Sequence, residues 1–327
     1  MFRSQHVKTI YNFFAAILLL LIANTFIHDI FETGRLNLEF DMIRTAFGGM
    51  PIVLTTWMSM FLSTILVLYP GFSLWAYQKN PMHWMENYLW IFMYFTYHVF
   101  MLYLPIKAAK TYELPVASSL IVVCEQVRLL MKSHAFVREN IPKAIKYKNS
   151  ENQHAGSNNN EIPSRPCPRF EKFLYFLFAP TLIYRDEYPR NKETDWVFVA
   201  TNFGQVLGCV FYTNYVLVRF CLPVFKDFNS KNITLQSFVL AAFNSILPGG
   251  MCLLLMFWGL LHAWLNAFGE MLRFGDRMFY KDWWNSTSFS NYYRSWNCVV
   301  QDWLYAYVYK DISGAGMFGL NRHEQVK

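Results

Sequence analysis

The residues best suited to chemistry lie near the C-terminal end of the sequence. Four polar side chains recur there at spacings that place them on one face of a helix, namely Asn291, Arg294, Asn297 and Gln301. A guanidinium group binds the oxygens of phosphates, and a carboxamide can donate a hydrogen bond to a carbonyl oxygen as negative charge develops on it. The spacing therefore predicts a polar helix face that binds an anionic ligand and assists a reacting carbonyl.

Aromatic residues are interleaved with polar ones just before this face. The run comprises Phe279, Tyr280, Lys281, Asp282, Trp283, Trp284 and Asn285. Tryptophan and tyrosine at this density are typical of a membrane–water interface. Interface anchoring explains the rings but not Asp282 and Asn285 among them, so the run is also a candidate for part of a site.

The elements that must position these residues are membrane helices. Hydrophobic residues make up 54% of the 327 residues and charged residues only 16%, whereas a soluble domain carries about 25% charged residues. Six apolar segments have roughly the length of a membrane helix: residues 10–30, 47–69, 88–106, 114–131, 196–222 and 233–268. The sequence therefore predicts an all-α fold, a polytopic transmembrane helical bundle.

Two apolar segments depart from a simple crossing. The segment 233–268 is too long for one span and contains Pro248 followed by two glycines, which predicts a kinked helix or two packed half-segments. The segment 173–183 is too short and contains Pro180, so we expect an interfacial or re-entrant piece.

The charges indicate which loops face the cytoplasm. The net charge is +7, and the basic excess is densest at residues 132–172, which we expect to form a cytoplasmic loop on the same side as the N-terminus. The lipid bilayer is the expected partner for these charges. Because the excess is spread between apolar segments rather than gathered on one face, we expect no nucleic-acid partner.

Ionisable residues inside apolar segments are costly and therefore candidates for function. Glu125 and Arg128 are three residues apart and are expected to neutralise each other on one helix face. His262 lies deep in the last segment, where a packing role is favoured over that of a catalytic base, and His98 is a weaker candidate. The six cysteines form no C-x-x-C pair, so reduced thiols and no metal site are expected.

The run from Phe279 to Asn285 resembles the FYxDWWN signature of the sterol O-acyltransferases, the acyl-CoA:cholesterol acyltransferases of the membrane-bound O-acyltransferase superfamily. The flanking stretches 262–277 and 302–311 resemble the same family. So do 136–140, 176–186 and 243–249. The resemblance covers nearly the whole chain to Asp311.

The resemblance implies a multi-pass enzyme of the endoplasmic reticulum that moves a fatty acyl group from acyl-CoA to a sterol hydroxyl. It implies that Asn297 assists the reacting carbonyl, that Asn291, Arg294 and Tyr309 contact acyl-CoA, and that Gln301 stands where the family commonly has a contacting histidine. Acyl-CoA is a co-substrate, so no cofactor is expected. A homo-oligomer is the expected assembly.

The family histidine that deprotonates the sterol should lie well beyond Asn297, past Lys327. We therefore expect residues 1–311 to form a partial domain, incomplete at its C-terminal end, and residues 312–327 a divergent polar tail. The chain would then lack the expected base, for which His262 is the alternative within the sequence.

Three other functions stay open at this point. A diacylglycerol acyltransferase shares the core of the signature, although the stretch 285–297 favours a sterol enzyme. A catalytically dead form would bind acyl-CoA or associate with a complete relative. A transporter or channel would be favoured by inverted repeats, which the sequence does not show.

Overall fold

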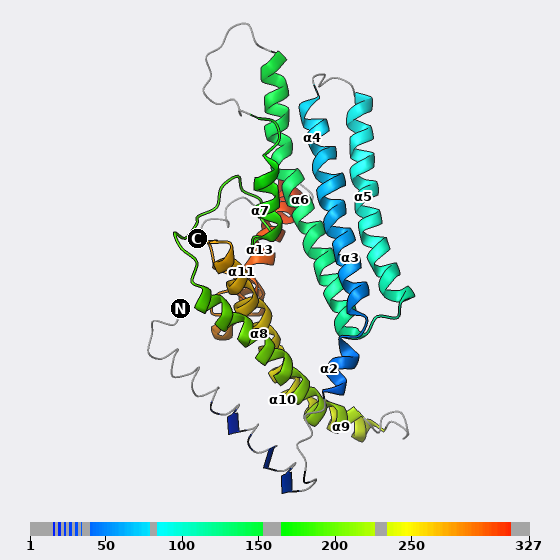
Figure 1. Cartoon of the computed structure of the whole chain (residues 1–327), viewed down its shortest axis with the longest axis vertical. Helices are drawn as coiled ribbons and strands as arrows, with labels where there is room; N and C mark the ends of the chain where they lie inside the picture. The colour runs from blue at the N-terminus through cyan, green and yellow to red at the C-terminus, as the bar shows by residue number, and fades with distance from the viewer. Residues whose placement is uncertain are drawn as a thin grey trace. The chain divides into compact units, whose positions relative to one another are not determined.

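The computed structural model describes residues 40–78, 84–152, 165–225 and 234–314, with scattered positions between 16 and 34 (Figure 1). The chain divides into two units, Met1–Met42 and Ile43–Lys327. The predicted span at residues 10–30 lies largely outside the described residues. Every element named in the described part is a helix, which confirms the all-α fold.

Four helical stretches are long and apolar enough to cross a membrane. They are Asp41–Tyr77, Met85–Thr111, Trp196–Phe225 and Leu235–Met271. Exposed large side chains cover the outer faces of these stretches, for example Leu66, Phe92 and Phe243. Apolar side chains of this kind are stable against lipid tails. The described residues therefore form a polytopic membrane bundle.

The first stretch is built from α2 (Asp41–Ala46), α3 (Met50–Ser63), the π-helical turn η1 (Thr64–Leu68) and α4 (Tyr69–Tyr77). Gly49 separates α2 from α3 with a φ of 70°. A Cβ at this position would lie 2.8 Å from the side chain of Leu114. Glycine is therefore required both by the left-handed backbone and by the close approach of the next helical hairpin.

Helices α5 (Trp84–Thr111) and α6 (Val116–Asn152) follow, and both pack beside α3 (Figure 1). Phe72, Val122, Leu129 and Phe136 belong to the buried cluster between these helices. Helix α6 is much longer than the predicted segment 114–131, and it is not among the stretches that qualify as membrane spans. Its charged residues, including Arg128 and Lys132, lower its hydropathy. The predicted fourth span is thus part of a longer, more polar helix.

The basic segment 132–172, expected to be a loop, is helical over much of its length. Helix α6 continues to Asn152, residues 153–164 lie outside the described part, and α7 begins at Phe170. Helix α7 (Phe170–Phe178) ends just before Pro180, which cannot continue a helix. Its nine residues are too few to cross a membrane, so α7 is not a span of its own.

The last two spans form an antiparallel pair (Figure 1). One comprises α8 (Trp196–Val216), the π-helical turn η2 (Leu217–Cys221) and α9 (Leu222–Phe225). The other comprises α10 (Leu235–Met256), the π-helical η3 (Phe257–Trp264) and α11 (Leu265–Met271). Gly259 lets them approach, because a Cβ there would lie 3.1 Å from Cys209 Cβ.

The expected interruption at Pro248 is not where the last span is irregular. Pro248 lies inside α10, and the helix continues to Met256. The irregular part is η3, which begins nine residues after Pro248 and in which π-helical hydrogen bonds replace the α-helical ones. Wider turns of this kind often occur at functional sites, and η3 contains His262.

Helices α12 (Phe289–Trp296), α13 (Cys298–Leu304) and α14 (Lys310–Gly314), with the π-helical turn η5 (Tyr305–Tyr309), carry the predicted ligand-binding residues. They dock on α6. The Trp303 indole N–H donates to the carbonyl oxygen of Met131 at 2.9 Å, and the His134 ring meets the edges of Trp303 and Tyr307. Arg138 pairs with Asp311 at 2.8 Å. We call these contacts between residues 131–138 and 303–311 the α6 seam.

Candidate active site

The signature segment runs from Phe279 to Asn285 and ends in a short 3₁₀ turn, η4 (Trp283–Asn285). Phe279 is buried beside Ala179 and Phe274. Its carbonyl oxygen accepts from the backbone N–H of Cys298 at 2.9 Å, and the Lys281 N–H donates to the carbonyl oxygen of Ser295 at 2.9 Å. The first residues of the signature therefore run directly beside the junction between α12 and α13.

The tryptophans of the signature differ in their surroundings. The Trp283 ring packs against Phe257 and Trp296, with centroids 5.0 and 4.6 Å away. Its indole N–H is buried and has no hydrogen-bond partner among the described residues. Trp284 is 53% exposed. Interface anchoring therefore suits Trp284, whereas Trp283 belongs to the interior and presents a buried donor that a ligand could satisfy.

The polar residues of the signature lie at the start and end of η4. The Asp282 carbonyl oxygen accepts from the Asn285 N–H at 3.0 Å, and both side chains are exposed. The structure thus places them at the rim of the signature rather than in its interior.

A buried ion pair anchors the segment that leads into the signature. Glu270, only 7% exposed, contacts Arg277 at 2.5 Å and accepts from the Asp195 backbone N–H at 2.9 Å. The Arg277 Nε donates to the Phe274 carbonyl oxygen at 2.7 Å. These bonds close the turn after α11 and fix the direction in which the signature leaves the membrane helix.

The four predicted polar residues do not lie on one continuous helix, and the prediction of a single stripe was wrong. Helix α12 ends at Trp296, and Asn297 has φ −142° and ψ 88° before α13 begins at Cys298. The Asn297 Oδ1 accepts from the Val300 N–H at 3.1 Å, so asparagine caps α13. Short polar side chains compete with the helix for backbone hydrogen bonds in this way.

The cap fixes the orientation of the Asn297 amide. Because its oxygen is directed at the first turn of α13, the amide nitrogen on the same planar group is directed elsewhere and keeps its N–H groups for other acceptors. Asn297 is half-buried and adjoins Cys298, whose N–H is bonded to the signature. The break in the helix therefore presents a held amide donor beside the signature.

The remaining predicted ligand-binding residues lie on both sides of this break. Asn291 donates to the Ser286 hydroxyl at 3.3 Å, and Arg294 is exposed on the last turn of α12. Gln301 is half-buried on α13. Tyr309 is 41% exposed and stacks on Tyr305, with centroids 6.0 Å apart and planes at 19°. The structure thus places Asn291 and Arg294 on one helix, and Gln301 and Tyr309 on the next.

His262 contacts the signature directly. Its Nδ1 lies 2.8 Å from the Tyr280 hydroxyl, and its ring packs on Trp258 at 4.2 Å. The Trp258 indole N–H in turn donates to Gln205 on α8 at 2.9 Å. His262 thus packs against the indole of Trp258, and one of its ring nitrogens is engaged by the signature tyrosine.

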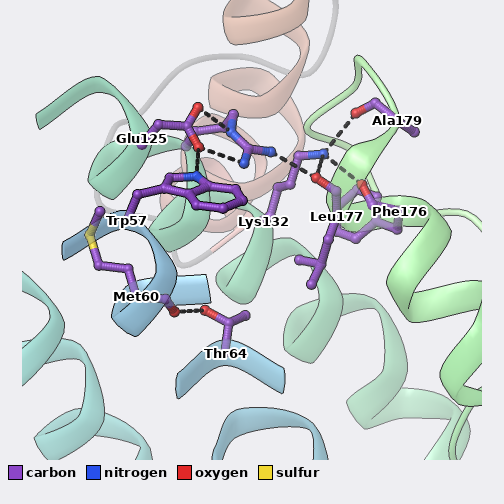
Figure 2. Close-up of polar contacts among 9 residues, drawn as sticks. Trp57, Met60, Thr64, Glu125, Lys132, Phe176, Leu177 and Ala179 are labelled. Atoms are coloured by element: carbon purple, nitrogen blue, oxygen red, sulfur yellow. Dashed lines mark hydrogen bonds and ion pairs between the residues drawn. The ribbon is translucent and has the colours of Figure 1, made fainter. Parts of the chain in front are cut away.

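Glu125 and Arg128 form the ion pair expected from their spacing, at 2.7 Å (Figure 2). The Trp57 indole N–H donates to Glu125 at 2.9 Å, and Arg128 donates to the Leu177 carbonyl oxygen at 2.7 Å. His98, the other weak candidate, bonds through Nδ1 to the carbonyl oxygen of Tyr94. The Glu125–Arg128 ion pair therefore links α6 to α3 and to the end of α7.

Sequence reasoning missed Lys132, which is only 1% exposed. Its ammonium donates to the carbonyl oxygens of Phe176, Leu177 and Ala179 at 2.5, 2.9 and 2.7 Å (Figure 2). These carbonyls lie at and just beyond the C-terminal turn of α7, where no intrahelical donors remain. Lys132 therefore caps α7. Its spacing of four residues from Arg128 was the signal that it shares the inward face.

The Arg138–Asp311 pair makes stability depend on pH. The hydrogen-bonded guanidinium lowers the pKa of the Asp311 carboxyl below its ordinary value, so the contribution is present above the pKa of the unfolded chain and is lost as pH falls through the folded value. Thermal unfolding in detergent should give the wild type a small advantage over Asp311→Asn between about pH 5 and 8 that decreases progressively as the pH falls below about 4. A difference in unfolding temperature between wild type and Asp311→Asn that stays unchanged down to about pH 3 would contradict a role for the ionised carboxylate.

The chain was compared with known proteins. Residues 52–325 match the model of MBOAT, the membrane-bound O-acyltransferase family. Sterol O-acyltransferase 1 of Mus musculus is 47% identical over 319 residues, covering 95% of this chain and 56% of the relative. Sterol O-acyltransferase 2 of Homo sapiens is 47% identical over 308 residues, covering 94% of this chain and 56% of the relative.

The chain thus spans little more than half the length of these relatives. The family match nevertheless includes the signature, the Asn297 cap, the α6 seam and all four candidate spans except the first residues of one. The chain belongs to the membrane-bound O-acyltransferase family.

Proposed function

We propose that the chain binds a long-chain fatty acyl-CoA and acts in the transfer of the acyl group to a sterol hydroxyl, forming a sterol ester. The observation that carries the proposal is the Asn297 amide, held by its cap at the α12–α13 break beside the signature. The similar proteins of known name are sterol O-acyltransferases, which favours a sterol as acceptor.

The proposed step is an acyl transfer without a covalent enzyme intermediate. A general base takes the proton of the sterol hydroxyl as its oxygen attacks the thioester carbonyl carbon, giving a tetrahedral intermediate with an oxyanion. The carbon–sulfur bond then breaks, the ester remains, and coenzyme A leaves as the thiol after taking up a proton. The Asn297 amide nitrogen donates to the carbonyl oxygen as its negative charge grows.

The headgroup of acyl-CoA carries phosphates and an adenine ring. We propose that Arg294 pairs with a phosphate and that Asn291, Gln301 and Tyr309 make polar and stacking contacts around it. Gln301 can form hydrogen bonds but cannot become cationic, so it adds no charge to the site. By resemblance, the general base is a family histidine that lies C-terminal to the position of Asn297, and His262 is the alternative among the residues that the structure describes.

We further propose that the chain resides in the endoplasmic reticulum membrane with its N-terminus in the cytoplasm, and that it forms homo-oligomers. The four candidate spans support residence in a membrane. The basic residues of α6 and of the segment that follows it support the orientation, because positively charged segments stay on the cytoplasmic side.

The test uses microsomes from cells that make no sterol esters of their own. Two versions are expressed: the 327-residue chain, and a joined version in which this chain replaces the matched region of the full-length mouse relative. Radiolabelled oleoyl-CoA is supplied with cholesterol or with diacylglycerol. We expect cholesteryl ester from the joined version and little from the chain alone.

Two outcomes would change the proposal. Efficient turnover by the chain alone would move the base to a residue within it, with His262 the first to substitute. Triacylglycerol as the main product of the joined version would replace the sterol by diacylglycerol as the acceptor. Absence of both products, with the joined protein present in the membrane, would overturn the proposed function.

A further inference from the structure

We propose that Arg138 is a positioning residue for acyl-CoA: through Asp311 it holds the 303–311 segment so that Tyr309 faces the ligand. The inference rests on the proposed function, because it concerns the same ligand. Arg138 itself lies on α6, more than 170 positions earlier in the chain than its partner, and from the sequence alone it is only a basic residue of an expected loop.

The 303–311 segment has two distinct faces. The inner face carries Trp303 and Tyr307, which belong to or pack on the main core; Tyr307 is only 5% exposed. The outer face carries the stacked pair Tyr305 and Tyr309, and the Lys310 ammonium lies 5.1 Å from the Tyr305 ring centre. Fixing the inner face on α6 therefore determines where the outer aromatic rings point.

The two ends of the segment are held by different means. Trp303 is secured by its bond to the Met131 carbonyl oxygen and by the His134 ring. At the other end Asp311 receives two parallel hydrogen bonds from Arg138, from Nε at 3.0 Å and from Nη2 at 2.8 Å. A guanidinium and a carboxylate joined at two points fix orientation as well as distance.

The position of Tyr309 makes this second attachment important. Tyr309 is the last residue of the π-helical turn η5 and lies between buried Tyr307 and paired Asp311. A π-helical turn contains an extra residue, which changes the direction of the side chains that follow it. Without Arg138, the core contacts hold the segment only as far as Tyr307, and Tyr309 lies beyond them.

The expected effect is on ligand binding rather than on folding. Both partners are substantially exposed, with side-chain exposures of 45% and 41%, and exposed ion pairs contribute little to stability. A displaced Tyr309 loses its contact with the bound ligand, however. We expect Arg138→Asp to weaken acyl-CoA binding by about fivefold or more, which corresponds to the loss of one modest contact.

The experiment titrates the 327-residue chain in detergent with a thioether analogue of oleoyl-CoA, which cannot be hydrolysed. Four variants are compared with wild type: Arg138→Asp, Asp311→Arg, the double variant with the charges exchanged, and Lys143→Asp as a matched control. Lys143 lies on the same helix and forms a comparably exposed pair with Asp186 at 2.6 Å. Its substitution makes the same change of charge away from the seam.

The charge changes in these variants distinguish a positioning role of Arg138 from simple attraction of an anionic ligand. Attraction alone predicts that Asp311→Arg binds more tightly and that Arg138→Asp and Lys143→Asp weaken binding equally. Positioning predicts that both single seam variants bind more weakly, that the double variant recovers to within about threefold of wild type, and that Lys143→Asp stays close to wild type. The first pattern would overturn the inference and the second would support it.

Hydrogen exchange of the 303–311 backbone distinguishes failure of the inference from failure of the proposed function. We expect faster exchange there in Arg138→Asp and an unchanged rate in Lys143→Asp. Unchanged exchange and affinity in Arg138→Asp would overturn the inference while leaving acyl-CoA binding by the wild type intact. A wild type that binds no analogue at all would overturn the proposed function, and the inference with it.

Discussion

Replacing Lys132 by methionine is expected to destabilise the protein by about 1–3 kcal/mol. Methionine has nearly the length of lysine but donates no hydrogen bond. The carbonyl oxygen of Phe176 would lose its Lys132 donor, whereas Leu177 would keep the bond from Arg128 and Ala179 the bond from the Thr181 N–H at 2.8 Å. A buried acceptor left without a partner costs about 1–3 kcal/mol.

The consequence extends beyond α7 because its end leads into the loop that supports the signature. In that loop, the Pro189 carbonyl oxygen accepts from the Gly275 N–H at 2.8 Å, and the Asn191 N–H donates to the Arg273 carbonyl oxygen at 2.8 Å. A displaced end of α7 would shift these contacts. Loss of Lys132 should therefore affect the signature as well as overall stability.

The measurement is the apparent unfolding temperature in detergent, read from the protein that remains monodisperse after heating. We expect a decrease of about 2–4 °C for Lys132→Met. Lys143→Met on the same helix is the matched control, since Lys143 pairs with Asp186 at the surface, and it should change stability by about 0.5 kcal/mol or less. Equal behaviour of the two variants would mean that water can replace the lysine as donor.

The second large effect is expected at Asn297, where two variants separate its structural role from its proposed chemical role. Asn297→Asp keeps an oxygen to accept from the Val300 N–H but has no amide donor. Asn297→Ala loses both. We expect alanine to lower stability by about 1 kcal/mol through loss of the cap, whereas aspartate should keep the fold.

Both variants should lose activity. Removal of a single oxyanion donor lowers turnover by about 100- to 1000-fold, and a carboxylate beside the developing oxyanion would add repulsion. The assay is cholesteryl ester formation by whichever version of the protein is active in microsomes, with stability measured on the same samples. Turnover within about threefold of wild type in Asn297→Asp would remove Asn297 from the chemistry and leave it as a helix cap.

The membrane helices could be predicted from the sequence because their signal is long and uniform. The segments 88–106 and 196–222 lie inside the helical stretches Met85–Thr111 and Trp196–Phe225. The first and last residues of the helices were predicted less accurately, since the helices continue beyond the apolar segments. Helix α6 is the clearest case, because its core-facing residues extend past the point at which charged residues end the apolar run.

The Glu125–Arg128 pair was predictable because both partners lie on one helix turn, where spacing alone determines proximity. The role of Lys132 was not predictable, because its acceptors are backbone carbonyls of another helix. Every residue type has such a carbonyl, so the sequence does not show which ones accept. The same limitation applies to the seam. Nothing in the residues around Arg138 indicates Asp311, since the two approach only when the chain folds.

The polar residues of the site were identified correctly as a group, but their arrangement was not. Periodicity assumes an uninterrupted helix, and Asn297 interrupts it by bonding to the backbone of Val300. Asparagine is among the residues that most favour the N-cap position, so the break had a signal. The positions of Arg294 and Gln301 on separate helices follow from it.

The π-helical turns have a consequence for how related sequences are aligned. Each such turn, for example residues 257–264 or 305–309, holds extra residues within an otherwise continuous helix, so it absorbs the loss of one residue by tightening to an α-helical turn. A one-residue gap at 305–309 would therefore leave Trp303 and Asp311 on the faces from which they contact α6, whereas the same gap in a regular α-helical stretch would rotate everything after it by about 100°. In this family, a single-residue gap inside a membrane helix should therefore be placed at a π-helical turn when sequences are aligned.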